Sequence, residues 1–262
     1  MQRIFILLFG IAVYAVFFLT FLYLIAFVGN LQLTPLAAVF APLTALVPHS
    51  IDAGGVTGNT VLSLITDFVL IALFSMQHSV MARSGFKAWL KRRLPAPAER
   101  SVYVLISSLM LILLFWQWRP MAEPVWRVTN GSLQILCWCL FAAGFGMVLL
   151  STFLIDHFDL FGLRQVWAHA QGREARSPRF ATPLFYRMVR HPLYLGFLLA
   201  FWSATEMSVG HLLFAIVMSC YILIAIRFEE RDLVRFHGEL YQRYRTRVPM
   251  IVPFKGWLRR LD

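Results

Sequence analysis

The sequence predicts an all-α, polytopic transmembrane helix bundle. Of its 262 residues, 59% are hydrophobic, whereas a soluble domain is roughly 45–50% apolar. The mean hydropathy is +0.68, and long runs without a charged residue recur, as membrane-crossing helices require. Lys and Arg flank these runs, so the net charge of +11 indicates membrane topology and not nucleic-acid binding. The length suits one integral-membrane domain over residues 1–262.

About six spans are expected, and the last two are short. They cover residues 4–28, 60–77, 102–118, 133–155, 193–205 and 212–226. The first is too long for the apolar core of a signal peptide. A membrane crossing needs roughly 20 apolar residues, so the last two are either thin, tilted spans or a re-entrant pair.

The remaining segments are expected to be loops and one surface helix. Residues 227–247 predict a cytoplasmic amphipathic helix at the C-terminal end, because apolar side chains recur there at steps of three and four. These side chains are Phe228, Leu233, Phe236, Leu240 and Tyr244. In the fourth span, Gly144 and Gly146 predict close packing against another helix.

The distribution of basic residues predicts the orientation in the membrane. Arg3, the segments 83–100 and 164–190, and the residues from 227 onward together hold 22 of the 24 Lys and Arg residues. Six alternating spans place all four groups on one side. The positive-inside rule makes that side the cytoplasm, which predicts a cytoplasmic-type membrane with both termini inside.

A polar motif opens the fifth span, Arg190-His-Pro-Leu-Tyr-Leu-Gly196. Pro192 suits the first turn of a helix, and the N-terminus of a helix favours an anion. Arg190 alone could be a flanking charge at a helix start. With His191 and Tyr194 beside it, a site for a polar ligand is the favoured interpretation.

Two adjacent carboxylates, Glu229 and Glu230, follow the sixth span. Surface ion pairing with neighbouring arginines is the alternative, and such pairs contribute little. Adjacent helical residues point about 100° apart, so one side chain can face inward, and we expect this to be Glu230. The two motifs lie at the same end of one hairpin. They therefore predict a site for a zwitterionic ligand at the cytoplasmic face.

Ionisable residues also stand at the cytoplasmic ends of two other spans. His78 follows the second span, and Asp156, His157 and Asp159 follow the fourth. Ionisable groups near membrane depth are functional candidates, whereas Asp156 and His157 could instead cap the fourth span. No cluster with metal-ligand spacing accompanies them, and the three cysteines form no disulfide framework. No metal is expected.

The C-terminal part resembles a known signature. The motif Arg190-His-Pro-x-Tyr-x-Gly196 is followed by Glu229-Glu-x-x-Leu233 and by Gly238-x-x-Tyr241-x-x-Tyr244-x-x-x-Val248-Pro249. Over residues 183–253 this is similar to the isoprenylcysteine carboxyl methyltransferase and phospholipid methyltransferase superfamily. The resemblance implies S-adenosyl-L-methionine bound at the cytoplasmic face. Its candidate contacts are Arg190, His191, Pro192, Tyr194, Gly196, Glu229 and Glu230.

Most of the remaining chain resembles a narrower family, the bacterial methanethiol S-methyltransferases. The resemblance rests on 9–30, on Gln77-His-Ser-Val-Met-Ala-Arg83, on Phe115-Trp-Gln-Trp118 and on 151–164. A related family named for nitric-oxide-linked gene clusters shares parts of these segments. The resemblance implies methylation of a small thiol, methanethiol, to dimethyl sulfide. A lipid, isoprenylcysteine or other thiol acceptor is one alternative, and a non-catalytic membrane partner protein is another.

Thiol methylation places modest demands on side chains. The sulfonium donor already carries a positive leaving group, so the reaction needs in-line placement and a deprotonated nucleophile. A protein thiol titrates near pH 8.5, and a simple alkyl thiol is a weaker acid. A nearby base therefore helps, and His78, Asp156 and His157 are the catalytic candidates. Methanethiol is small and apolar, so a site open to the bilayer would admit it.

Overall fold

The structure, a computed structural model, describes residues 1–34, 48–56, 58–175 and 181–253. It divides into two compact units. The first comprises Met1–Thr129, Phe158–Arg176 and Thr205–Val217, and the second comprises Asn130–His157, Ser177–Ala204 and Met218–Asp262. Part of the predicted loop at 29–59, residues 35–47 and 57, lies outside the described residues.

The all-α membrane class is confirmed. Within the described residues, five helical segments are long and apolar enough to cross a membrane. They are α1 (Gln2–Val28), α4 (Thr60–Ala82), the segment Ala96–Gln117, α7 (Gly131–Ile155) and α11 (Val209–His237). Ala96–Gln117 joins the short η2 (Ala96–Ala98) to α6 (Glu99–Gln117). The chain is therefore a multi-pass membrane protein.

Shorter elements connect these helices. They are η1 (Leu31–Leu33), α5 (Ser84–Lys91), β1 (Pro124–Arg127), α8 (His157–Leu160), α9 (Leu163–Ala170), η3 (Leu184–Arg187), α10 (Pro192–Trp202), β2 (Glu206–Ser208) and α12 (Glu239–Arg247). The two strands pair in antiparallel register, with Pro124 opposite Ser208 and Arg127 opposite Glu206. An ion pair of 2.6 Å joins the last two side chains. This small sheet was not predicted.

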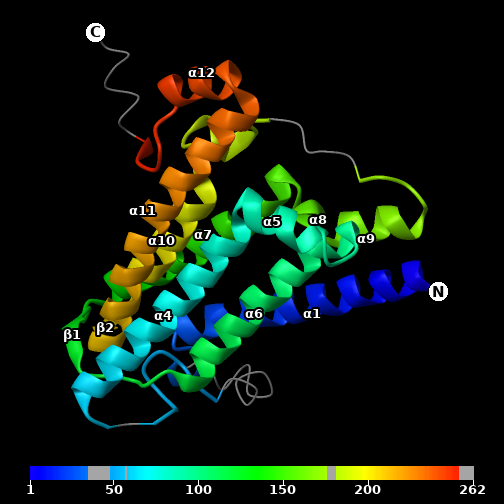
Figure 1. Ribbon diagram of the computed structural model, residues 1–262. Helices are drawn as coiled ribbons and strands as arrows, with labels where there is room; N and C mark the ends of the chain where they lie inside the picture. Colours follow the sequence, from blue (N-terminus) through cyan, green and yellow to red (C-terminus); the bar gives the residue numbers. More distant parts are fainter. Residues whose placement is uncertain (35–47, 57, 176–180, 254–262) are drawn as a thin grey trace. The chain divides into compact units, whose positions relative to one another are not determined.

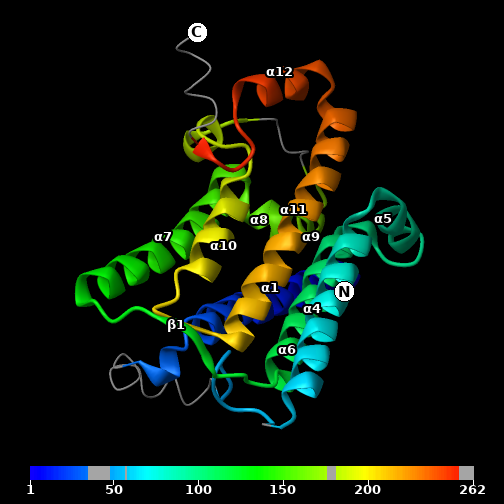
Figure 2. The same cartoon turned by 90° about the vertical axis from the view of Figure 1, so that its left-hand side faces the viewer.

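In the first unit, α6 packs against both α1 and α4 (Figures 1 and 2). Aromatic rings fill the core near the end of α1. The Phe27 ring lies 4.9 Å from Phe115 and 5.6 Å from Trp118, in centroid distances. Trp118 is 1% exposed, and its indole N–H donates to the carbonyl of Ile51 at 3.0 Å. The polar end of the indole is therefore satisfied inside the core.

In the second unit, α7 lies beside α10 (Figure 2), and the two helices approach each other closely at glycines. A Cβ added at Gly144 would lie 2.6 Å from the carbonyl oxygen of Gly196, and a Cβ at Gly196 would lie 2.6 Å from the carbonyl oxygen of Gly144. The predicted role of Gly144 is confirmed. Around Gly146 nothing lies within 4 Å of such an atom, so that glycine does not serve this contact.

The last span differs from the prediction. The expected short span at 212–226 and the first half of the amphipathic helix predicted at 227–247 form one helix, α11, of 29 residues, and the second half forms α12. The reason is that no Gly or Pro interrupts residues 211–237, so helix propensity carries through the polar boundary. Gly238 then adopts φ 55° and ends the helix. Of the two spans predicted to be short, α10 is short in the described residues, with 11 residues.

Candidate functional site

The polar motif at the start of α10 is built by local sequence. His191 is the N-cap and Pro192 occupies the first turn, where its missing N–H costs nothing. The chain just before α10 lies along the C-terminal tail. Arg190 N–H donates to the carbonyl of Pro249 at 2.9 Å, and His191 N–H donates to that of Met250 at 3.2 Å. These bonds fix the direction in which both side chains leave the backbone.

The Arg190 guanidinium joins three segments through its hydrogen bonds. Its Nε donates to Glu230 Oε1 at 2.7 Å, and Nη2 lies 2.6 Å from the same oxygen. Its Nη1 donates to the carbonyls of Arg245 at 3.0 Å and Val248 at 2.6 Å. All three nitrogens are therefore engaged within the protein. Arg190 clamps the start of α10, the C-terminal part of α11 and the end of α12.

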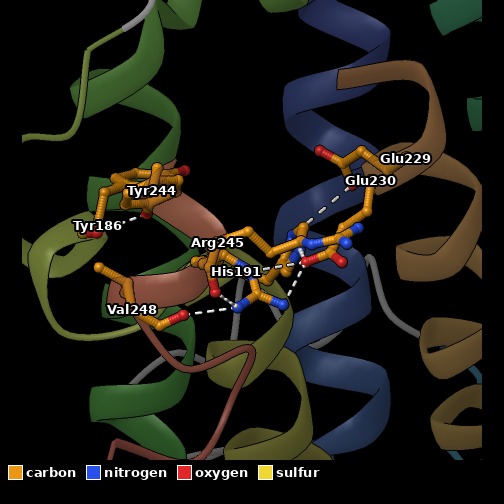
Figure 3. A network of polar contacts seen from close by, with 8 residues as sticks. Tyr186, His191, Glu229, Glu230, Tyr244, Arg245 and Val248 are labelled. Atoms are coloured by element: carbon orange, nitrogen blue, oxygen red, sulfur yellow. Dashed lines mark hydrogen bonds and ion pairs between the residues drawn. The ribbon is translucent and has the colours of Figure 1, made fainter. Parts of the chain in front are cut away.

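The two neighbouring carboxylates have different surroundings. Glu230 is 13% exposed, and its Oε1 also lies 3.2 Å from His191 Nε2. Glu229 is 44% exposed, and its Oε2 lies 3.9 Å from His191 Nδ1. Figure 3 shows both glutamates on the same turn of α11 above His191. Glu230 is thus the inward-facing residue of the pair, as expected, and Glu229 keeps a carboxylate open to a ligand.

Tyrosines surround this cluster. The Tyr244 hydroxyl donates to the carbonyl of Tyr186 at 2.5 Å, as Figure 3 shows. Burial raises the pKa of Tyr244 to about 12 and raises the pKa of Tyr186 and of Tyr241 as well. These phenols stay neutral at pH 7. The ring of Tyr194 lies 5.7 Å from that of His191, so this predicted site residue adjoins the cluster.

The other two predicted members of the motif shape the backbone. Pro192 is buried and starts α10. Gly196 contributes its backbone to the contact with α7. Their part in ligand binding stays a prediction, and their described contacts position the helix that carries His191 and Tyr194.

His78 lies in the first unit with its own partners. Its Nε2 lies 2.8 Å from the Tyr103 hydroxyl, and its Nδ1 lies 3.2 Å from Ser107 Oγ. Gln77 donates through Nε2 to the same Ser107 Oγ at 3.4 Å. The sequence interpretation missed Tyr103 and Ser107. The signal was available, because they stand four residues apart on one face of the third span.

Asp156 and His157 adopt the capping arrangement. Asp156 is the C-cap of α7, and its N–H donates to the carbonyl of Thr152 at 3.1 Å. His157 is 4% exposed and stacks on Phe153 with ring centroids 4.1 Å apart. Its Nδ1 lies 2.8 Å from Thr152 Oγ1. Burial lowers the pKa of His157, so the ring is neutral at pH 7. A catalytic role for either residue stays a prediction.

The fold and these clusters define a multi-pass helical membrane protein with a charged site at the end of its C-terminal hairpin. A family model described as NnrU protein matches residues 68–225. The methanethiol S-methyltransferase of Crocosphaera subtropica is 48% identical over 256 residues, which are 98% of this chain and 94% of that protein. The methanethiol S-methyltransferase of Mycobacterium tuberculosis is 45% identical, covering 97% of this chain and 98% of its own length.

More distantly, Nurim of Mus musculus is 28% identical over 191 residues, covering 69% of this chain and 72% of Nurim. No solved structure matches. The chain belongs to the NnrU protein family and, within it, to the group of the methanethiol S-methyltransferases.

Proposed function

We propose that this protein is a methyltransferase that uses S-adenosyl-L-methionine to convert methanethiol to dimethyl sulfide. The observation that carries the proposal is the similarity to methanethiol S-methyltransferases along nearly the whole chain. A lipid or isoprenylcysteine acceptor is not favoured, because relatives that are 45–48% identical are all named for methylation of methanethiol, a small thiol. The thiol reaches the site from the bilayer or from water, since it is small and apolar.

The residues of the cluster fit this methyl donor. A molecule with an ammonium, a sulfonium and a carboxylate needs partners of both signs. Glu229 presents a carboxylate that is 44% exposed toward positive groups. The first turn of α10 presents backbone N–H groups toward a negative group, and its N-cap His191 makes no side-chain cap hydrogen bond to them. When bound, S-adenosyl-L-methionine supplies a methyl group on a positively charged sulfur.

Within this cluster we assign different roles to different residues. Glu229, His191 and Tyr194 are the ones we assign to contact with the donor. We assign Arg190 and Glu230 as positioning residues. The two side chains form an ion pair with each other, and Arg190 also donates hydrogen bonds to carbonyls of the tail. Pro192 and Gly196 set the start and the packing of α10.

Activation of the thiol is assigned to His78. A neutral imidazole accepts the thiol proton at one ring nitrogen. The resulting imidazolium carries two N–H groups, and hydrogen-bond acceptors beside them stabilise it. Ser107 Oγ, 3.2 Å from Nδ1, and Tyr103 Oη, 2.8 Å from Nε2, are placed to accept hydrogen bonds from it. Asp156 and His157 are the alternative bases. Their described contacts are those of a helix cap.

We further propose the orientation of the protein in a bacterial cytoplasmic membrane, with both termini and the charged cluster on the cytoplasmic side. The strand pair supports an even number of crossings. β1 lies between α6 and α7, and its partner β2 directly precedes α11, so α7 and α11 start at the same face. The chain between them must return across the membrane through α10, although this helix spans only about 16 Å at 1.5 Å per residue.

The test is an acceptor panel. The purified protein is incubated with S-adenosyl-L-methionine labelled in its methyl group and with methanethiol, longer alkyl thiols, an isoprenylcysteine and phosphatidylethanolamine. Label in methanethiol product, in excess over every other acceptor, is the expected result. Preferential labelling of the lipid or isoprenylcysteine would replace the substrate assignment. Absence of both donor binding and transfer would indicate a non-catalytic partner protein.

A further inference from the structure

A groove of about 390 Å³ lies beside α1 in the first unit. Its lining is apolar apart from one arginine. It consists of Leu7, Ile11, Phe158, Leu163, Arg164 and Trp167. The volume lies in the range of ligand sites, roughly 300–1,000 Å³, and is far larger than a methanethiol molecule needs. None of these residues belongs to the clusters assigned above.

The two walls of the groove have a simple local origin. Val166 is fully buried, and a Cβ added at Gly10 would lie 2.6 Å from its Cγ2. This close approach seats the short helix α9 on α1. Residues three apart share a helix face, so Arg164 and Trp167 stand together beside that contact. Trp167 remains 56% exposed, so its ring borders the groove without being covered by the rest of the protein.

The opposite wall comes from α1, through Leu7 and Ile11. The N-terminal part of this helix is exposed around the groove, with Ile4 at 63%, Leu8 at 59% and Ile11 at 47%, and the helix is apolar enough to cross a membrane. Arg3 precedes Leu7 by four residues and Ile11 by eight, which correspond to about 6 and 12 Å along a helix. A Cβ added at Gly172, just beyond α9, would lie 3.0 Å from Arg3 Nη1. The groove therefore begins at the level of a basic boundary and runs toward the apolar interior.

We infer that this groove is a binding site for one anionic phospholipid, with an acyl chain between α1 and α9 and the headgroup phosphate at Arg164. The positive charge of Arg164 and the position of Trp167 beside it favour a phospholipid as the occupant. Arginine recognises phosphate through several N–H groups, and Trp favours the interface between headgroups and acyl chains. No acidic residue lines the groove. The site would couple the N-terminal span to the lipid composition of the leaflet.

The experiment is native mass spectrometry of the full-length protein released from detergent, with phosphatidylglycerol and phosphatidylcholine of equal chain length. Arg164→Gln removes the charge, and Ile11→Trp fills the groove while leaving the charges. Arg243→Gln is the matched control, because this exposed arginine of α12 pairs with Glu239 on its own helix. Thermal unfolding of each variant confirms that it is folded.

We expect the wild-type protein to retain phosphatidylglycerol over phosphatidylcholine. Arg164→Gln should reduce that retention about fivefold, the scale of one basic residue near an anionic surface. Ile11→Trp should reduce it for both lipids, and Arg243→Gln should leave it unchanged. Equal retention of the two lipids would overturn the inference. So would retention that survives Ile11→Trp, because the lipid would then sit on surface charge and not in the groove. Displacement by inorganic phosphate alone would also contradict it.

Discussion

At the scale of single residues, Glu229 and Glu230 are neighbours with different surroundings. The carboxylate of Glu230 holds Arg190 and His191, whereas Glu229 is 44% exposed. Glu229→Gln should therefore weaken S-adenosyl-L-methionine binding about tenfold or more, the scale of a hydrogen bond to a charged group, while the thermal midpoint stays unchanged. Isothermal calorimetry measures the affinity.

The matched control is Glu239→Gln. Glu239 is 82% exposed and pairs with Arg243, so its removal should leave the affinity as it was. An affinity that is the same in Glu229→Gln and in the wild-type protein would remove Glu229 from the donor site.

A second prediction at this scale concerns thiol activation. His78→Ala should lower turnover about 10²-fold, the usual scale for loss of a general base, without changing donor affinity. Raising the pH should restore part of the rate, because methanethiol then ionises without help. Tyr103→Phe removes the hydroxyl 2.8 Å from His78 Nε2 and should cause a smaller loss that the same rise in pH also relieves.

The measurement is a pH–rate profile of each variant with methanethiol, and His157→Ala is run beside them. Near-normal turnover of His78→Ala at neutral pH, together with a large loss in His157→Ala, would move the base to the end of α7.

At the scale of elements, the tail is held by the Arg190 clamp. Arg190→Lys keeps the charge, but an ammonium cannot hold Glu230 and the carbonyls of Arg245 and Val248 in one plane. We expect it to lower the free energy of unfolding of the docked tail by about 2 kcal/mol. Hydrogen exchange of residues 244–250 should accelerate accordingly, and donor binding should weaken because His191 loses its support.

Arg231→Lys serves as the comparison, since Arg231 lies 5.8 Å from the ring of Phe228 on its own helix. Equal exchange rates in Arg190→Lys and in the wild-type protein would show that the clamp does not hold the tail.

Elements were predicted well where composition alone decides them. The first four spans lie within a few residues of the structure, because long apolar runs admit no other fold in lipid. The boundary between α11 and α12 was misplaced, since amphipathic periodicity signals a helix face but not where one helix becomes another. The strand pair β1–β2 depends on contacts between segments about 80 residues apart, which local pattern cannot reveal.

The site was predicted only in part, because motif spacing is visible in the sequence whereas contacts with distant backbone groups are not. Motif spacing brought Arg190, His191 and Glu230 to one end of a hairpin, and the structure joins them. It could not show that Arg190 is saturated by the carbonyls of the tail. Every residue has a backbone carbonyl, so the sequence does not reveal which carbonyls accept hydrogen bonds from Arg190. The sequence alone therefore could not distinguish a ligand-binding arginine from a positioning one.

At the scale of the whole molecule, the orientation in the membrane has a direct test. Gly85 in α5 and Gly131 at the start of α7 have nothing within 4 Å of an added Cβ, so each tolerates cysteine. In a background with the native cysteines 137, 139 and 220 changed to serine, Gly131→Cys should react with a membrane-impermeant maleimide in intact cells. Gly85→Cys should react only after lysis. The reverse pattern would invert the topology.

The central claim concerns chemistry, and one measurement addresses it directly. The purified protein is mixed with methanethiol and S-adenosyl-L-methionine deuterated in its methyl group, and the headspace is examined by gas chromatography and mass spectrometry. We predict dimethyl sulfide that carries one deuterated methyl group, formed in proportion to enzyme and reduced in Glu229→Gln when the donor is below saturation. If the donor binds but no deuterated dimethyl sulfide forms under conditions where the protein is folded, methanethiol is not its substrate.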